Sequence, residues 1–272
     1  MSTDEGTMSK LGDKIDKLGQ QTGSTMGFGM ATRKNATNPA MVLLGRGTLD
    51  DLKKKATVQD SAVDAFLVEL GEWPGDALDK ATEALKDKLW GVRIAQLDAE
   101  QAARLKALGC DFAVLDLGDT PASVLNDEEF GKYLAIGPGL DEDTARAVHE
   151  LPLDGVLYTP QDKLFPLTLR SLFELQKARS YVDRPIILAA PASVGQAELE
   201  TLRNAGLAGL AADATAKKEL AATREAILNL PKPKPPKKGQ ALALLPQYAQ
   251  NDAAQHEHEH EEPDEDDRGE NF

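Results

Sequence analysis

Glu69, Arg93 and Asp116 are well placed for chemistry, because each stands at the end of a short apolar run. In the runs 65–70 and 90–95 the bulky residues take alternate positions, as expected for the face of a strand that packs against helices. Glu69 and Arg93 belong to the opposite face, so both are predicted to point toward the interior. Charges inside a protein cost several kcal/mol of desolvation per ion, so they are often kept for a ligand or a reaction. The structural alternatives are a mutual salt bridge for Glu69 and Arg93, and a cap or loop salt bridge for Asp116.

The same carboxylates suggest a metal site. Glu69, Asp116 and Asp119 carry oxygen ligands of the kind that Mg²⁺ prefers. Arg46, between two glycines after the run 41–44, is suited to hold a carboxylate or phosphate through two parallel hydrogen bonds. The set suits the stabilisation of an enolate in a lyase or aldolase, although single acids at strand ends carry no diagnostic spacing.

Other mechanisms lack their residues. No run ends in a lysine, so a Schiff-base aldolase would need Lys163 to reach in from a loop. His149 lies in a helical segment and Cys110 at the start of a run, so neither histidine-based zinc hydrolysis nor cysteine catalysis is expected. The segment His256–His260 alternates histidine with glutamate, which could chelate a metal, but its acidic surroundings favour a solvated low-complexity tail.

Eight short apolar or β-branched segments, bounded by turn residues, would position these side chains. The segments are 41–44, 65–70, 91–97, 112–117, 133–136, 155–158, 185–189 and 207–211. Between them lie amphipathic helical segments, of which the clearest are 98–108, 141–151 and 195–205. In the first of these, Asp98 and Gln101 fit a capping box and Gly109 fits a C-terminal stop.

Eight alternations of strand and helix predict a parallel sheet closed into a (β/α)₈ TIM barrel, with its chemistry at the carboxyl ends of the strands. An open, doubly wound sheet is the alternative. It is disfavoured because no Gly-x-Gly-x-x-Gly turn follows the first strand.

The last two predicted βα units read PIILAAPASVGQAEL (185–199) and NAGLAGLAAD (204–213). This segment resembles the end of phosphate-binding barrels such as the indole-glycerol-phosphate and thiamine-phosphate synthases. The resemblance implies a phosphate held by a glycine-rich turn and a helix N-terminus, where Ser193 and Gly195 would donate. Two departures weaken it: Pro191-Ala192 replaces paired glycines, and Asp213 puts an anion where the phosphate would lie.

Composition divides the chain into three regions: 1–39, 40–230 and 231–272. The first contains a predicted short amphipathic helix at 8–18, packed on the barrel or on a partner, and the second is the barrel. The third begins with a Pro/Lys spacer at 231–238 and an apolar island at 241–248, and it ends in an acidic tail too poor in apolar residues to fold.

The tail carries much of the charge. Residues 251–272 hold ten acids and one arginine, so −9 of the net charge of −14 falls there and −5 remains for the other residues. The folded part gives no reason to expect nucleic acid or a membrane as partner. No apolar run reaches the ~18 residues of a membrane span. With one cysteine and a polar N-terminus, the sequence predicts a cytoplasmic protein.

Two hypotheses about function follow. The first is a barrel lyase, aldolase or isomerase, with assistance by Mg²⁺ as a variant, that acts on a small anionic carbonyl compound. Glu69, Arg93 and Asp116 would be catalytic, and Arg46, Ser193 and Gly195 would bind the substrate. The second is a non-catalytic barrel that forms a homo-oligomer or binds a protein partner through residues 8–18 or 241–248. The enzyme is favoured narrowly, because this fold hosts enzymes far more often.

Overall fold

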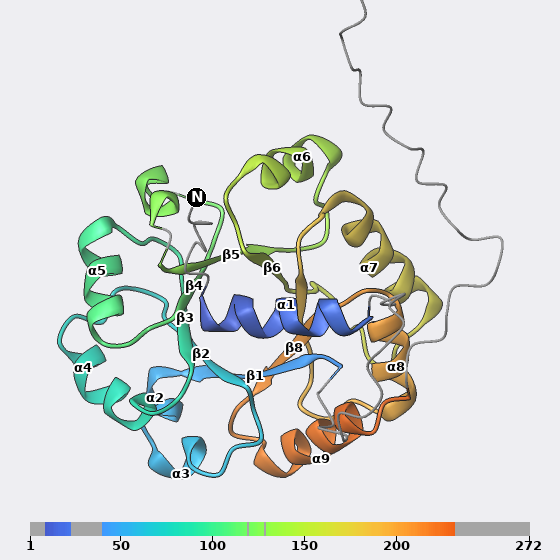
Figure 1. Ribbon diagram of the computed structural model, residues 1–272, viewed down its shortest axis with the longest axis horizontal. Helices are drawn as coiled ribbons and strands as arrows, with labels where there is room; N and C mark the ends of the chain where they lie inside the picture. Colours follow the sequence, from blue (N-terminus) through green and yellow to red (C-terminus); the bar gives the residue numbers. More distant parts are fainter. Residues whose placement is uncertain (1–8, 23–39, 119, 128, 232–272) are drawn as a thin grey trace, which may run out of the picture. The chain divides into compact units, whose positions relative to one another are not determined.

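The computed structural model describes residues 9–22, 40–118, 120–127 and 129–231. Within these ranges all eight expected strands are present, and they pair in parallel in chain order until β8 meets β1 (Figure 1). This closure confirms the predicted (β/α)₈ TIM barrel and rules out the open sheet. The strands are β1 (Val42–Thr48), β2 (Ala65–Glu69), β3 (Trp90–Ile94), β4 (Phe112–Leu115), β5 (Gly131–Ile136), β6 (Gly155–Tyr158), β7 (Ile186–Ala189) and β8 (Gly209–Asp213).

Helices connect successive strands and surround them, except between β4 and β5, where a 3₁₀ turn makes the connection. In the predicted capping box of α5, the Asp98 carboxylate accepts from Gln101 N at 2.8 Å and the Gln101 side chain accepts from Asp98 N at 3.1 Å. No helix of the described ranges is long and apolar enough to cross a membrane. The helices are α1 (Lys10–Thr22), α2 (Leu49–Leu52), α3 (Lys55–Val58), α4 (Ala77–Thr82), α5 (Ala99–Ala107), α6 (Glu142–Glu150), α7 (Leu169–Tyr181), α8 (Gln196–Asn204) and α9 (Lys217–Leu228), with 3₁₀ turns η1 (Glu83–Leu85) and η2 (Ala122–Asn126).

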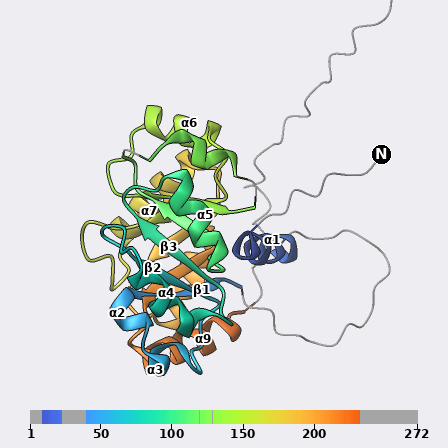
Figure 2. The same cartoon turned by 90° about the vertical axis from the view of Figure 1, so that its left-hand side faces the viewer.

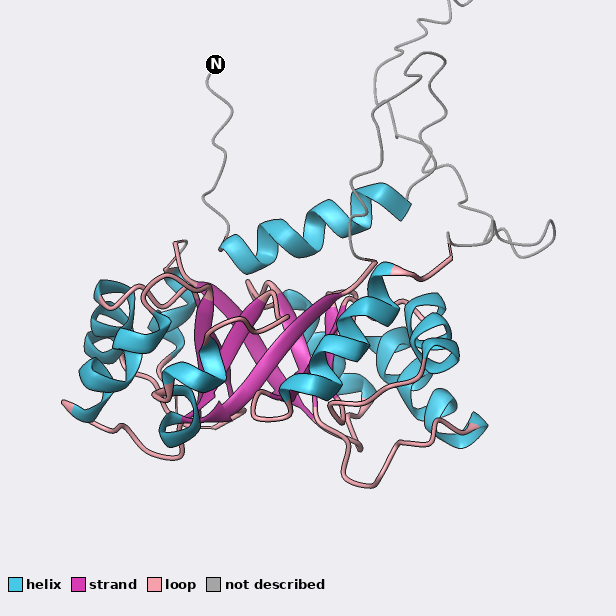
Figure 3. Cartoon of the chain, turned by 90° about the horizontal axis from the view of Figure 1, so that it is seen from below, coloured by secondary structure: helices cyan, strands magenta, loops and turns pink. Residues whose placement is uncertain are grey.

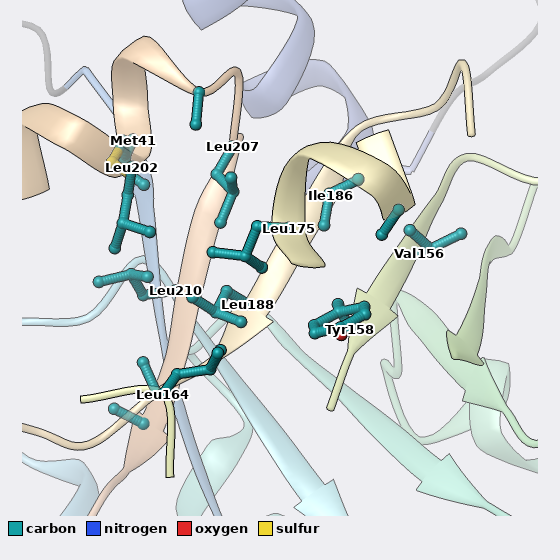
Figure 4. Packing of buried hydrophobic residues seen from close by; sticks show 14 of the residues in the cluster. Met41, Val156, Tyr158, Leu164, Leu175, Ile186, Leu188, Leu202, Leu207 and Leu210 are labelled. Carbon is teal, nitrogen blue, oxygen red and sulfur yellow. The ribbon is translucent and has the colours of Figure 1, made fainter. Parts of the chain in front are cut away.

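Alternation along each strand separates an inner from an outer apolar layer. Val42 and Leu44 belong to the inner cluster, whereas Leu43 between them belongs to the outer layer. Part of the outer layer is visible in Figure 4, where Leu175 of α7 and Leu188 of β7 pack in the same cluster. The strands are therefore packed with apolar side chains on both faces.

Glycines inside the barrel make room for two aromatic rings. The rings of Phe112 and Tyr133 meet edge to face with centroids 5.6 Å apart. A Cβ on Gly91 would lie 2.4 Å from the Phe112 carbonyl oxygen, and one on Gly155 would lie 2.8 Å from both the Pro185 carbonyl oxygen and the Tyr133 ring. Both distances are too short for any side chain, so the inward-facing glycines are required by the packing of the rings.

Helix α1 lies across the amino ends of the strands (Figures 2 and 3). Leu11 and Ile15 are buried in the inner cluster, which agrees with the amphipathic helix expected near 8–18. The carboxylate of Asp111, just before β4, accepts from Lys10 N at 2.9 Å and from Leu11 N at 3.0 Å. Two of the free N–H groups at the start of α1 are thereby satisfied, and the helix covers the end of the barrel formed by the amino ends of the strands.

Candidate active site

The barrel mouth, the end formed by the carboxyl ends of the strands, carries four inward-directed charges on adjacent strands. Ala65 and Leu67 belong to the inner cluster, so Glu69 continues their face; Arg93 alternates with the outer-layer residues of β3. The face assignment predicted for Glu69 and Arg93 is therefore confirmed. Arg46 at the end of β1 and Asp116 directly after β4 complete the group.

The four charges form two ion pairs. Arg46 Nη1 lies 3.6 Å from Glu69 Oε1, and Arg93 Nη2 lies 3.0 Å from Asp116 Oδ1. The four side chains are between 27% and 38% exposed, whereas the inner cluster beneath them is buried. Pairs this exposed contribute at most about 1 kcal/mol to stability, so folding alone gives little reason to place them at the mouth.

The pairing differs from the mutual Glu69–Arg93 bridge considered from the sequence. These two residues are register partners on β2 and β3, but within the described ranges each pairs with a different neighbour. Arg93 stands opposite Val114, and Asp116 lies two residues further on; Arg46 and Glu69 have the same offset across β1 and β2. Each arginine therefore reaches diagonally toward the mouth, a distance that only a long side chain can cover.

Hydrogen bonding distinguishes the two carboxylates. Arg93 donates from both Nε, at 3.3 Å, and Nη2, at 3.0 Å, to Asp116 Oδ1. Glu69 accepts no hydrogen bond from the described residues, since its closest contact with Arg46, at 3.6 Å, is too long for one. Asp116 thus fixes the guanidinium of Arg93, while Glu69 keeps its oxygens available for a proton or a ligand.

The loop after β7 is the predicted phosphate loop, and its donor is already engaged. Gly195 N, at the start of α8, donates to Glu198 Oε2 at 3.2 Å, and the other oxygen of Glu198 accepts from Leu167 N at 2.8 Å. Ser193 is exposed beside it. An anion could bind Gly195 N only by displacing the chain's own carboxylate.

Asp213 fills a similar position at the end of β8. Its Oδ1 accepts from Thr215 N at 2.8 Å and from the Thr215 hydroxyl at 2.7 Å. This carboxylate therefore closes the turn before α9 with donors that a phosphate would need. The sequence departs from the phosphate-binding pattern at Asp213, and in the structure this carboxylate already occupies the donors of Thr215.

Thr159 is a mouth residue to which the sequence analysis gave no role. It follows β6 on the face of Gly155 and Leu157, and Leu157 belongs to the inner cluster. Its hydroxyl is buried without a hydrogen-bond partner in the structure. A buried hydroxyl left unpaired costs about 1–3 kcal/mol, so Thr159 is a candidate to contact a ligand. The sequence does contain a signal for it, because Thr159 comes two residues after Leu157 and therefore lies on the same inward face.

The predicted metal ligands are only partly described. Glu69 and Asp116 are each engaged with an arginine, and Asp119 lies outside the described residues. In the part of the chain that the structure describes, no three His, Cys, Asp or Glu side chains gather into a group that could hold a metal. Binding of Mg²⁺ by Glu69 and Asp116 would require both to leave their arginines.

Cys110 lies before β4, at the amino end of the barrel, as expected. The thiol is buried, its Sγ is 3.3 Å from the Phe112 carbonyl oxygen, and burial raises its pKa far above the ordinary value. The thiol therefore stays protonated at neutral pH, which agrees with the expectation that it is not a nucleophile.

Comparison with solved structures supports the fold. Tryptophan synthase of Mycobacterium tuberculosis matches at 11% identity with a TM-score of 0.54, covering 81% of this chain and 97% of that one. The tryptophan synthase A-subunit of Pyrococcus furiosus matches at 10% identity with a TM-score of 0.50, covering 70% of this chain and 96% of that one. No protein-family model and no curated protein sequence matches the chain. At such identities the likeness establishes the barrel alone.

Proposed function

We propose that this barrel is a lyase, aldolase or isomerase acting on a small anionic carbonyl compound. The observation that carries the proposal is the pair of half-exposed ion pairs facing inward above a buried apolar interior. Such a mouth offers cationic groups for an anionic substrate beside carboxylates able to move a proton, which is the combination that enolate chemistry requires.

Glu69 is the proposed general base. Its oxygens accept no hydrogen bond from the described residues, and its side chain is 36% exposed, so a substrate carbon beside a carbonyl can approach it. Removal of that proton forms an enolate, and the proton returns from Glu69 to the same or a neighbouring atom in an isomerisation. In a lyase or aldolase reaction, the same transfers accompany the breaking or forming of a carbon–carbon bond.

The two arginines have separate proposed roles. Arg93 is oriented by Asp116, whose Oδ1 receives two of its donors, and its Nη1 group donates no hydrogen bond to the described residues. Arg46 makes no side-chain hydrogen bond within the described residues, so it can take a carboxylate or phosphate bidentately. Arg93 would then stabilise the enolate oxygen, while Arg46 holds the anionic end of the substrate.

Mg²⁺ assistance remains part of the proposal as a variant. Glu69 and Asp116 are the described residues that would hold the ion, and bound Mg²⁺ would polarise the substrate carbonyl. Since Glu69 would then be a ligand, EDTA provides a direct comparison: exchange that survives EDTA assigns Glu69 to proton transfer rather than to metal binding.

The test is proton exchange at carbon, which needs only one substrate. Pyruvate, oxaloacetate and dihydroxyacetone phosphate are incubated with the protein in D₂O, and the loss of carbon-bound protons is followed by NMR. We expect exchange above the buffer rate with at least one compound, and a decrease of about 10²–10⁴-fold in Glu69→Gln. Glu225→Gln is the control, because Glu225 is an exposed glutamate on α9. The enzyme proposal fails if no compound exchanges, or if Glu69→Gln exchanges at the wild-type rate.

The second candidate is a non-catalytic barrel that serves in binding or assembly. Glu198 and Asp213 favour it, because they engage donors on which the phosphate-binding pattern relies. Segment 8–18 could bind a partner through Leu11 and Ile15 only if α1 left the barrel, and segment 241–248 lies outside the described residues. This function would be favoured if the protein catalyses no proton exchange and if its mass, measured by light scattering, depends on its concentration.

A further inference from the structure

A cavity of about 580 Å³ lies at the amino end of the barrel, opposite the mouth. One wall is α1, and the others are the segments that lead from α7 into β7 and from α8 into β8. Figure 1 shows α1 running across the barrel toward these helices. We call this space the arginine cavity, because its charged lining residues are Asp16, Arg179, Asp183, Arg184 and Arg203.

The arginines of this cavity differ from most others in the chain. Among the described residues, the arginines that pair with a carboxylate are Arg46, Arg93, Arg104, Arg146 and Arg224. Arg170, Arg179, Arg184 and Arg203 form no such pair there, and the last three all line the one cavity. Asp16 and Asp183 are exposed at its edge, and no ion pair joins them to these arginines.

The three guanidiniums are held in place by neutral acceptors. Arg203 is only 8% exposed and donates to the Pro231 carbonyl and the Asn204 side chain. Arg179 Nη1 donates to the Val182 carbonyl at 2.8 Å. These contacts orient the groups, and no carboxylate of the described residues forms an ion pair with them.

Arg184 shows the same shortage of acceptors most directly. Its Nη2 donates to the carbonyls of His149 and Leu151, at 3.4 and 3.3 Å, whereas its Nε is buried and has no hydrogen-bond partner among the described residues. Each guanidinium carries five N–H donors, so the cavity holds more donors than its own residues satisfy. Arg203 is buried and Arg179 and Arg184 are partly buried, and the two aspartates of the lining form no ion pair with them, so a bound anion would offset part of the cost of desolvating these charges.

We propose that the arginine cavity is a binding site for a small organic anion bearing a phosphate or carboxylate group. Planar guanidiniums match the geometry of both groups, and three of them favour a multiply charged one. The volume lies within the usual range of small-molecule sites, ~300–1,000 Å³. Ile15, Leu18 and Leu207 add apolar walls, which suit the carbon body of an organic ligand.

Occupancy of this site is coupled to α1. Because α1 supplies one wall, a bound anion stabilises the docked helix by mass action. Hydrogen–deuterium exchange of the amides of α1 therefore slows when the ligand is added. This readout separates the arginine cavity from the mouth arginines, which lie at the other end of the barrel.

Titration calorimetry of the full chain at low salt tests the proposal, with inorganic phosphate and citrate as separate probes. We expect saturable binding of at least one probe; the tighter one identifies phosphate or carboxylate as the preferred group. Arg179→Gln and Arg184→Gln should each weaken it about tenfold or more. Arg170→Gln should leave it unchanged, because Arg170 is an unpaired arginine on the same helix α7 that does not line the cavity.

Circular dichroism melts establish that each variant is folded, and Arg184→Lys, which keeps the charge, should retain part of the affinity. The site is refuted by wild-type protein that shows no saturable binding up to about 10 mM of either probe. It is equally refuted if Arg179→Gln and Arg184→Gln bind as the wild type does, or if α1 exchange is unaffected by a saturating probe.

Discussion

Replacing Leu11 with alanine tests how firmly α1 closes the barrel. Leu11 is 0% exposed and lies in the inner cluster with residues from several strands, so the substitution removes buried apolar volume at a closed end. Leu→Ala changes in cores cost about 2–5 kcal/mol. The hydrogen bonds that Lys10 N and Leu11 N donate to the Asp111 carboxylate do not involve the side chain that is changed, so we attribute the loss of stability to packing.

The expected loss is about 3 kcal/mol, near the middle of that range, because the site is fully buried but α1 can shift as a unit. Urea unfolding followed by far-UV circular dichroism measures it, and Lys17→Ala, at an exposed position of the same helix, is the control. If Leu11→Ala unfolds within about 0.5 kcal/mol of Lys17→Ala, the packing of α1 on the barrel contributes little to stability and the argument is wrong.

Two further predictions address the barrel interior and the start of α1. Gly91→Ala should destabilise the fold by at least about 1–3 kcal/mol, because its Cβ would lie 2.4 Å from the Phe112 carbonyl oxygen. Gly71→Ala is the control and should not destabilise the fold, because a Cβ there would have nothing within 4 Å. Equal unfolding midpoints for the two variants would contradict the prediction. Burial raises the pKa of Asp111 despite its two backbone hydrogen bonds, so its carboxyl carbon should titrate in NMR above the usual value of about 3.9. The folded state then binds this proton more tightly than the unfolded chain does, and the contribution of Asp111 to stability falls as pH rises through the window between the two pKa values. If the titration midpoint of Asp111 lay below about 3.9, its contribution to stability would rise with pH instead, and the prediction would be wrong.

The mouth charges should contribute more to activity than to stability. Asp116→Asn removes one member of a pair whose side chains are 27% and 38% exposed, so we expect a loss of stability below about 1 kcal/mol. The same variant should lower kcat in the exchange assay, with a smaller effect on KM, because Arg93 would no longer be held in place to stabilise the enolate oxygen. A large loss of stability with unchanged kcat would assign Asp116 a structural role.

Much of this architecture could be predicted from the sequence, because the patterns that indicate strands and helices are local. The alternation of apolar segments and capping residues predicted eight strands and the helices between them, and α5 shows the predicted Asp98–Gln101 box. The face of Glu69 and Arg93 also followed from alternation within single strands. Such properties depend on residues a few positions apart, which a sequence displays directly.

Partner choice at the mouth was decided by the tertiary structure. Which carboxylate each arginine meets depends on the stagger between strands, and this stagger places Glu69 near Arg46 and Asp116 near Arg93. The contact of Glu198 with Leu167 N, 31 residues earlier in the chain, likewise depends on how the start of α8 packs beside the loop before α7, whereas its contact with Gly195 N, three residues away, is local.

The arginine cavity had no signature in the sequence at all. Its arginines come from the last turns of α7 and α8 and from the segment between α7 and β7, and its third wall comes from α1, more than a hundred residues earlier in the chain. Closure of the sheet is what brings these segments to one end of the barrel. The sequence by itself therefore determined the elements and the faces they present, whereas the charges that meet across them were set by register and closure, which are properties of the whole barrel.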